Sequence, residues 1–193
     1  MKMKIARRVF LLGLLILLGV ARPASAQSGG DVSDVRVEYK FGEQVNFLAR
    51  IQSSIPIQNA MVTFRTSDGI AQTQPVSVNP DGTAGYIYDA SLNALPPFAH
   101  IVFWFDVALA DGTSFTSGNY DFTYADNRFP WQEREEGALR VHWYDGDAAF
   151  GAAVLDAARR GLDSARALVP MEPTGTIDIY VYATAADLQG ALV

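Results

Sequence analysis

The stretch "HIVFWFDVAL", His100–Leu109, predicts the central strand of a β-sheet protein. Its aromatic residues Phe103, Trp104 and Phe105 cannot all face the same way, because successive side chains of a strand point to opposite faces. We therefore expect this strand to lie inside a sheet that is buried on at least one face. Trp104 is interpreted as a core residue, and an aromatic patch that binds sugar is the alternative for this side chain.

Short strands and tight turns are predicted on both sides of this stretch. Apolar and polar residues alternate in Val35–Lys40 and again in Val45–Ile51, which is the period of a strand with one buried face. "NPDG" at Asn79–Gly82 and "LPPF" at Leu95–Phe98 mark a turn and a corner. About seven strands, roughly 10 residues apart, predict an all-β sandwich over residues 32–125 that resembles immunoglobulin or fibronectin type III modules.

The N-terminus has the three parts of a secretory signal peptide. A basic segment, Lys2–Arg8, precedes the apolar run Val9–Val20, and the small residues Ala24 and Ala26 provide a cleavage site. This run is shorter than the roughly 20 apolar residues that span a bilayer. We therefore expect residues 1–26 to be removed, which leaves a secreted or extracytoplasmic protein without a membrane partner.

Charge and composition exclude several functional classes. The chain has 15 basic and 21 acidic residues and a formal net charge of −6, so no nucleic-acid partner is predicted. It has no cysteine, which excludes a disulfide framework, thiol catalysis and thiolate metal sites. The stability must come from a packed core, for which 49% hydrophobic residues are sufficient.

A different pattern begins after a charged linker, residues 126–138. Arg140–Tyr144 alternates as a strand, apolar residues recur at helical spacing in Phe150–Val169, and Thr174–Ala183 alternates again. A strand, a helix and a strand predict a right-handed βαβ unit with parallel strands. The α+β part, residues 139–193, is expected to be incomplete, because a parallel sheet normally has more strands and cover on both faces.

No residue pattern predicts catalysis or metal binding in this chain. His100 and His142 are its two histidines, and neither has a second ligand at zinc-site spacing. Asp145 and Asp147 lack the further oxygen ligands of a calcium loop, and Asp147 is better explained as the N-cap of the following helix. The acidic run Glu133–Glu136 is interpreted as a solvated face. We therefore predict no catalytic, metal-binding or cofactor-binding residue.

Several segments resemble one family of secreted bacterial proteins. "FPW" at Phe129–Trp131, "VHWYDGDAAFG" at Val141–Gly151 and "IDIYVYATAADLQGAL" at Ile177–Leu192 resemble proteins with a peptidase-MA-like domain, which is similar to the thermolysin-like (gluzincin-type) zinc metallopeptidases. "LPPFAHIVFWFDVALADGTSFTS" at Leu95–Ser117 is similar to the N-terminal β-module of that family.

The resemblance implies that this chain is the N-terminal portion of a secreted zinc metallopeptidase. A full-length member is expected to bind zinc through an H-E-x-x-H helix and to act on a peptide or protein substrate. The chain lacks this motif and is expected to be inactive as given. The alternative is a non-catalytic exported binding or adhesion module in which the sandwich binds the ligand.

Overall fold

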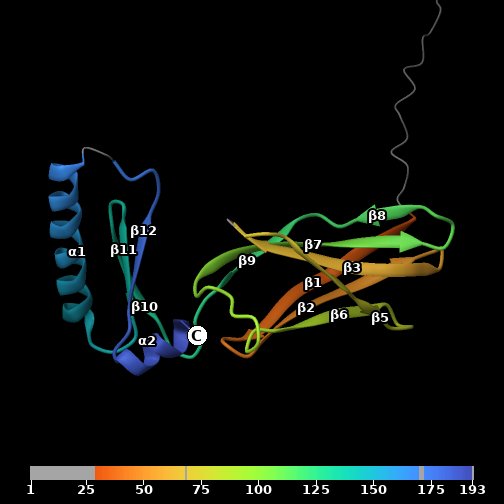
Figure 1. Ribbon diagram of the computed structural model, residues 1–193, viewed down its shortest axis with the longest axis horizontal. Coiled ribbons are helices and arrows are strands. Elements are labelled where there is room, and N and C mark those ends of the chain that lie inside the picture. Colours follow the sequence, from red (N-terminus) through yellow and green to blue (C-terminus); the bar gives the residue numbers. More distant parts are fainter. Residues whose placement is uncertain (1–28, 68, 170–171, 193) are drawn as a thin grey trace, which may run out of the picture.

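The computed structural model describes residues 29–67, 69–169 and 172–192 (Figure 1). The predicted signal peptide and its cleavage residues Ala24 and Ala26 lie outside this range. Within it, no helix is long and apolar enough to cross a membrane.

Two sheets form the first part of the described chain, and their bounds follow in sheet order. The four-stranded sheet is β1 (Gly30–Lys40), β2 (Gln44–Ser53), β6 (Thr83–Asp89) and β5 (Ser77–Val78). The five-stranded sheet is β4 (Gln72–Pro75), β3 (Ile57–Thr66) and β7 (Ala99–Leu109), with both β8 (Ser114–Thr116) and β9 (Tyr120–Tyr124) on the far side of β7. All these pairs are antiparallel, and the sheets stack face to face, which confirms the predicted β-sandwich (Figure 1).

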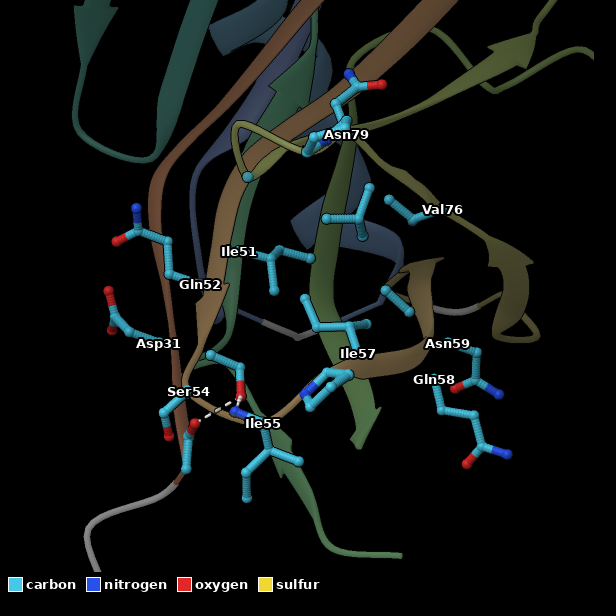
Figure 2. Close-up of a pocket in the computed structure, with 18 of the residues that line it drawn as sticks. Asp31, Ile51, Gln52, Ser54, Ile55, Ile57, Gln58, Asn59, Val76 and Asn79 are labelled. Atoms are coloured by element: carbon cyan, nitrogen blue, oxygen red, sulfur yellow. Dashed lines mark hydrogen bonds between the residues drawn. The ribbon is translucent and has the colours of Figure 1, made fainter. Parts of the chain in front are cut away.

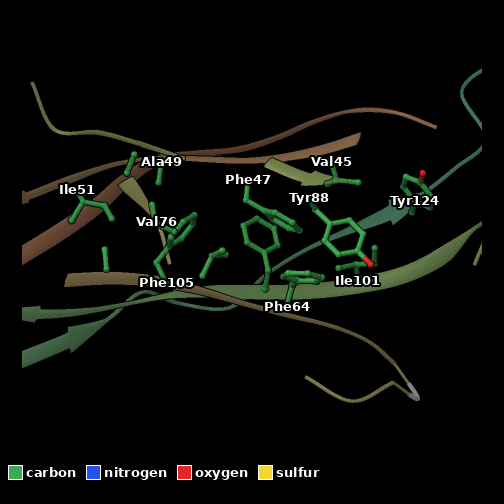
Figure 3. Packing of buried hydrophobic residues seen from close by; sticks show 14 of the residues in the cluster. Val45, Phe47, Ala49, Ile51, Phe64, Val76, Tyr88, Ile101, Phe105 and Tyr124 are labelled. Carbon is green, nitrogen blue, oxygen red and sulfur yellow. The ribbon is translucent and has the colours of Figure 1, made fainter. Parts of the chain in front are cut away.

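Strand β7 is central to its sheet, as its sequence predicted. Phe103 and Phe105 point inward and are at most 2% exposed. Phe103 meets Phe47 of the opposite sheet with ring centroids 5.1 Å apart. Phe47 also stacks on Phe64 at 4.9 Å (Figure 3). Trp104 points the other way, to the outer face, where it is partly exposed. Its interpretation as a core residue is therefore wrong, because the strand alternation that buries its two neighbours turns it outward.

The second part of the chain is a smaller layer of three strands and two helices. Strand β11 (Leu139–Trp143) pairs antiparallel with β10 (Gln132–Glu136) and parallel with β12 (Ile177–Val181). Helix α1 (Ala148–Leu168) packs on one face of this sheet, and the short helix α2 (Ala185–Leu192) ends the described chain (Figure 1).

The start of α1 depends on two residues that the sequence supplies locally. Asp147 is its N-cap, as predicted: the carboxylate accepts a hydrogen bond of 2.9 Å from the Phe150 amide. Gly151, in the first turn, lies directly against the buried ring of Trp143, where a Cβ atom would come within 2.2 Å of the indole. The absence of a side chain at Gly151 therefore lets the helix approach the sheet closely.

The acidic run of the predicted linker forms a strand. Glu133, Glu135 and Glu136 belong to β10, and every residue of this strand is exposed, which confirms the solvated face. Gly137, with φ +61°, turns the chain back into β11. Part of the predicted linker, residues 126–138, is therefore a strand, and pairing with β11 satisfies its backbone groups.

The sandwich and the second part meet at a buried aspartate. Asp126 is fully buried and accepts hydrogen bonds from Arg128 Nη2 at 2.6 Å and from the Tyr182 hydroxyl at 3.0 Å. The indole of Trp131 donates to the Asp126 carbonyl at 2.7 Å. Phe98, in the corner before β7, stacks on Tyr180 of β12 with centroids 3.4 Å apart.

Candidate functional site

A cavity of about 1260 Å³ lies at the end of the sandwich farther from α1 (Figures 1 and 2). The start of β1, the passage from β2 into β3 and the turn between β5 and β6 surround it. We call this space the end cavity. Its lining residues are Gly29–Asp31, Ile51–Ala60, Val76 and Val78–Gly82.

The floor of the end cavity is apolar. Ile51, Ala60 and Val76 belong to the sandwich core and are 1%, 3% and 8% exposed. Ile57 and Val78 pack against the same core and are partly exposed. Figure 2 shows Ile51, Ile57 and Val76 pointing into the middle of the cavity. A ligand would therefore meet an apolar surface continuous with the core of the protein.

The rim of the cavity is polar and rich in side-chain amides. Gln52, Gln58 and Asn59 are exposed around the floor, together with Asp31 and Ser54 (Figure 2). Within the described residues, none of these five side chains forms a hydrogen bond to the protein. Each amide offers both donors and acceptors, so the rim presents both kinds of group to a ligand.

The turn on one side of the cavity is fixed by its own hydrogen bonds. The Asp81 carboxylate accepts from the Thr83 amide at 2.9 Å and from the Thr83 hydroxyl at 2.7 Å, and these bonds lower the pKa of Asp81. Asn79 Nδ2 donates to Thr83 Oγ1 at 2.9 Å. Gly82 adopts φ +85°, which favours glycine. This wall therefore keeps its shape and carries a negative charge at neutral pH.

The connector between β2 and β3 is also held in place. Ser53 Oγ donates to the Gly29 carbonyl at 2.6 Å and accepts from the Ile55 amide at 3.1 Å (Figure 2). These bonds tie the connector to the start of β1. The amides of Gln52 and Gln58 are thus attached to an ordered backbone on both sides of the connector.

Among the described residues, the lining of the end cavity contains no histidine. Its hydroxyl side chains, Ser53 and Ser54, have no histidine beside them. Across the described ranges, no group of three or more His, Cys, Asp or Glu side chains could hold a metal ion. The zinc expected for a full-length relative therefore has no support in these residues.

The histidines considered in the sequence lie away from the cavity. His142 is 8% exposed on β11, where Nε2 lies 2.8 Å from Asp178 Oδ1 and the ring stacks on Tyr180 at 4.3 Å. His100 is exposed on β7, with Nε2 at 3.8 Å from Asp121. Asp145 is exposed in the turn before α1. The structure does not bring these residues together.

Sequence reasoning missed the residues that line the end cavity. The segment "IQSSIPIQNA", Ile51–Ala60, does carry a signal, because its polar residues interrupt two apolar strands. A loop between strands is usually polar, however, so this pattern alone does not distinguish a binding rim from an ordinary turn.

Comparison with known proteins gives distant structural likenesses only. No family model and no curated protein matches the chain. A carbohydrate-binding module of family 56, a β-1,3-glucan binding domain, is 17% identical with a TM-score of 0.34, over 48% of this chain and 98% of that one. OgpA from Akkermansia muciniphila is 16% identical with a TM-score of 0.38, over 49% of this chain and 28% of OgpA. A family 64 laminaripentaose-producing β-1,3-glucanase from Paenibacillus barengoltzii is 17% identical with a TM-score of 0.35, over 61% of this chain and 28% of the glucanase.

These findings correct the family suggested by the sequence segments. No family model supports the resemblance to peptidase-MA-like zinc metallopeptidases, and the similar structures include a carbohydrate-binding module and a glucanase. The predicted metallopeptidase function is therefore wrong. All three likenesses have TM-scores below 0.5, so they assign no function to this chain.

Proposed function

We propose that this chain is a non-catalytic exported binding module that holds a neutral carbohydrate in the end cavity. The observation that carries the proposal is the ring of unengaged amides, Gln52, Gln58 and Asn59, above an apolar floor. A polar rim above an apolar floor matches the chemistry of a sugar. The hydroxyl groups of a sugar both donate and accept hydrogen bonds, and its C–H faces are apolar.

The size and charge of the cavity narrow the ligand class. At about 1260 Å³ it exceeds the roughly 300–1000 Å³ of ordinary small-molecule sites, which leaves room for several linked sugar units. Asp31 and Asp81 are its charged side chains, and both are acidic. An acidic glycan would be repelled by these carboxylates, whereas a neutral glycan would find hydrogen-bond acceptors.

The remaining parts of the chain have separate roles around this site. Residues 1–26 direct export and are removed, and residues 32–125 are the binding sandwich, of immunoglobulin or fibronectin type III kind. Residues 126–138 link it to the βαβ unit of residues 139–193, which packs on the end opposite the cavity. The protein acts outside the cytoplasm without nucleic acid, membrane or metal.

Binding of soluble polysaccharides to the chain without its signal peptide tests the proposal. Affinity electrophoresis would use the neutral glycans laminarin, galactomannan and arabinoxylan, with polygalacturonate as the acidic comparison. Isothermal titration calorimetry would then measure the affinity for the glycan that is retained. Retention of at least one neutral glycan and not of polygalacturonate is expected, and retention of none of the neutral glycans would overturn the proposal.

A double variant of the rim identifies the site. Gln58→Ala with Asn59→Ala removes two amides whose loss is expected to weaken binding about 10- to 30-fold, since each net hydrogen bond contributes about 1 kcal/mol. Gln72→Ala is the matched control, because Gln72 is an exposed glutamine of the same sheet outside the cavity. Equal affinity of the double variant and the control would exclude the end cavity as the site.

A further inference from the structure

A partly exposed tryptophan lies on the outer face of the five-stranded sheet. Trp104 of β7 pairs with Thr63 of β3, and both side chains face away from the sandwich core. We call the surface around it the Trp104 face. Its members are Met61, Thr63 and Arg65 of β3, Val102, Trp104 and Asp106 of β7, Thr116 of β8 and Asp121 of β9.

The indole of Trp104 is held in one orientation. Its Nε1 donates to Asp106 Oδ2 at 3.0 Å, and the other oxygen of Asp106 accepts from the Thr116 hydroxyl at 2.7 Å. The Asp106 carboxylate therefore connects the indole of Trp104, on β7, to Thr116 of β8. A side chain on a water-facing surface usually has rotational freedom, so this fixed ring has already lost the entropy that a ligand would otherwise have to remove.

The strand position opposite Trp104 is covered by its neighbours. Thr63 is only 5% exposed although it is on the outer face, so neighbouring side chains cover it, and its hydroxyl lies 3.0 Å from that of Thr73. On the other side, pairing with β7 is interrupted between β8 and β9. At Gly118, in this interruption, an added Cβ atom would have no neighbour within 4 Å. Trp104 therefore has no ladder partner on this side of β7, and the space at Gly118 is unfilled.

The charges of the Trp104 face favour a neutral, polyhydroxylated ligand. Arg65 is exposed and, within the described residues, forms no ion pair or hydrogen bond. Asp106 and Asp121 lie on the same face, so its one positive charge stands beside two negative charges. These groups offer donors and acceptors on both sides of an apolar ring, which matches the hydroxyl groups and C–H face of a sugar.

The Trp104 face continues the rim of the end cavity along one strand. Asn59, on the rim, and Thr63, opposite Trp104, both belong to β3 and are about 13 Å apart at the rise of a strand. Asn59, Met61 and Thr63 pair with Ala108, Asp106 and Trp104 in turn, so they share one face. A chain of sugar units that leaves the cavity at Asn59 can therefore follow β3 to the indole.

We propose that the Trp104 face is a second subsite, on which a sugar ring of the same neutral glycan stacks when the glycan is longer than the end cavity. This inference rests on the proposed function of the cavity. It requires that binding depends on glycan length. A short oligosaccharide uses the cavity alone, whereas a polysaccharide uses both surfaces.

Trp104→Ala separates the two surfaces when a long and a short ligand are compared. The probes are laminarin, galactomannan and arabinoxylan, each with its own trisaccharide, measured by calorimetry. The expected loss for the polysaccharide is on the order of tenfold, because removal of a tryptophan anchor commonly has an effect of this size. The affinity for the trisaccharide is expected to stay the same. Ile87→Ala is the matched control, because Ile87 is an exposed apolar residue of β6 that lies outside both the cavity and the Trp104 face.

A second measurement reports directly on the ring. Addition of the polysaccharide to the unaltered protein is expected to change the tryptophan fluorescence, and this change is expected to disappear in Trp104→Tyr, where Trp131 and Trp143 remain. Thermal unfolding of each variant shows that the fold is kept. The tyrosine variant is expected to recover part of the affinity that the alanine variant loses, because an aromatic face is still present.

The outcomes distinguish this inference from the proposed function. If Trp104→Ala binds the polysaccharide as tightly as the unaltered protein, the second subsite is overturned while the cavity stands. If Trp104→Ala weakens the polysaccharide and the trisaccharide equally, the length dependence is overturned. If the Gln58→Ala, Asn59→Ala variant binds both ligands normally, the cavity fails, and with it the continuous track along β3.

Discussion

Replacement of Gly151 by alanine should destabilise the second part of the chain, although the same change usually stabilises a helix. Gly151 lies in α1, and an added Cβ atom would come within 2.2, 2.4 and 2.6 Å of three ring carbons of Trp143. Carbon atoms pack at about 3.5–4.0 Å, so the ring would have to move by more than about 1 Å. Trp143 is 4% exposed, which leaves it little room to do so.

The size of the effect follows from two opposing contributions. Alanine gains about 1 kcal/mol over glycine in a helix interior, and overpacking of a well-packed core costs about 1–3 kcal/mol, occasionally more. Because the clash is with a rigid buried ring, we expect a net loss of about 1–2 kcal/mol. Gly161 provides the matched control in the same helix, since it is exposed and an added Cβ atom would contact nothing within 4 Å. Gly161→Ala should therefore stabilise the helix by up to about 1 kcal/mol.

Urea denaturation followed by circular dichroism at 222 nm measures the helix, and the fluorescence of the tryptophans reports on Trp143. The two variants are expected to shift the unfolding midpoint in opposite directions. If Gly151→Ala shifts the midpoint upward as Gly161→Ala does, the close approach of α1 to Trp143 does not exist in solution. The packing argument would then be refuted.

The buried junction, the Asp178 ion pair and the cavity each give a measurable effect. Tyr182→Phe removes one hydrogen bond to the buried Asp126, and calorimetric unfolding should show a loss of about 1–2 kcal/mol; an unchanged unfolding temperature would contradict the bond. Hydrogen bonds from Arg140 and His142 lower the pKa of Asp178, so the stability that they contribute is present above the unfolded pKa of about 3.9 and is lost as the pH falls through the folded pKa. Asp178→Asn should therefore flatten the acid limb of the stability curve, which denaturation at stepped pH measures, and an equally steep limb would disprove this assignment. Addition of EDTA should leave glycan binding unchanged in calorimetry, because the proposed contacts are amides and apolar groups, and a loss of binding would reveal a metal-dependent site.

The sandwich was predictable because its signal is local. The alternation that buries Phe103 and Phe105 lies within a single segment of the sequence. A period of two residues indicates a strand with one buried face, and several such strands indicate a sandwich. The side to which Trp104 points was less predictable, because either face of a central strand can be buried. The packing of the two sheets decides which face is covered. Trp104 lies on the outer face of the five-stranded sheet.

The sequence did not indicate the role of several residues, because segments distant in the sequence form their surroundings. Gln132–Glu136 has no apolar alternation, and it becomes a strand only because β11 provides the partner backbone. Asp126 has the charge of a solvated linker residue but is fully buried, because Arg128 and Tyr182 reach it from two segments. The cavity amides Gln52, Gln58 and Asn59 are ordinary loop residues in the sequence, and the strand pairing around the connector gathers them around one floor.

The position of the buried junction has a consequence for the proposed function. Asp126 is satisfied only when Arg128 and Tyr182 are both in place, and leaving a buried carboxylate without partners would be strongly destabilising. The ring of Phe98, stacked on Tyr180, adds an apolar contact between the same two parts. The second part is therefore fixed to one end of the sandwich, and separation of the parts would break both sets of contacts. Because the end cavity opens at the other end, the cavity and the Trp104 face can bind a long glycan without any movement of this junction.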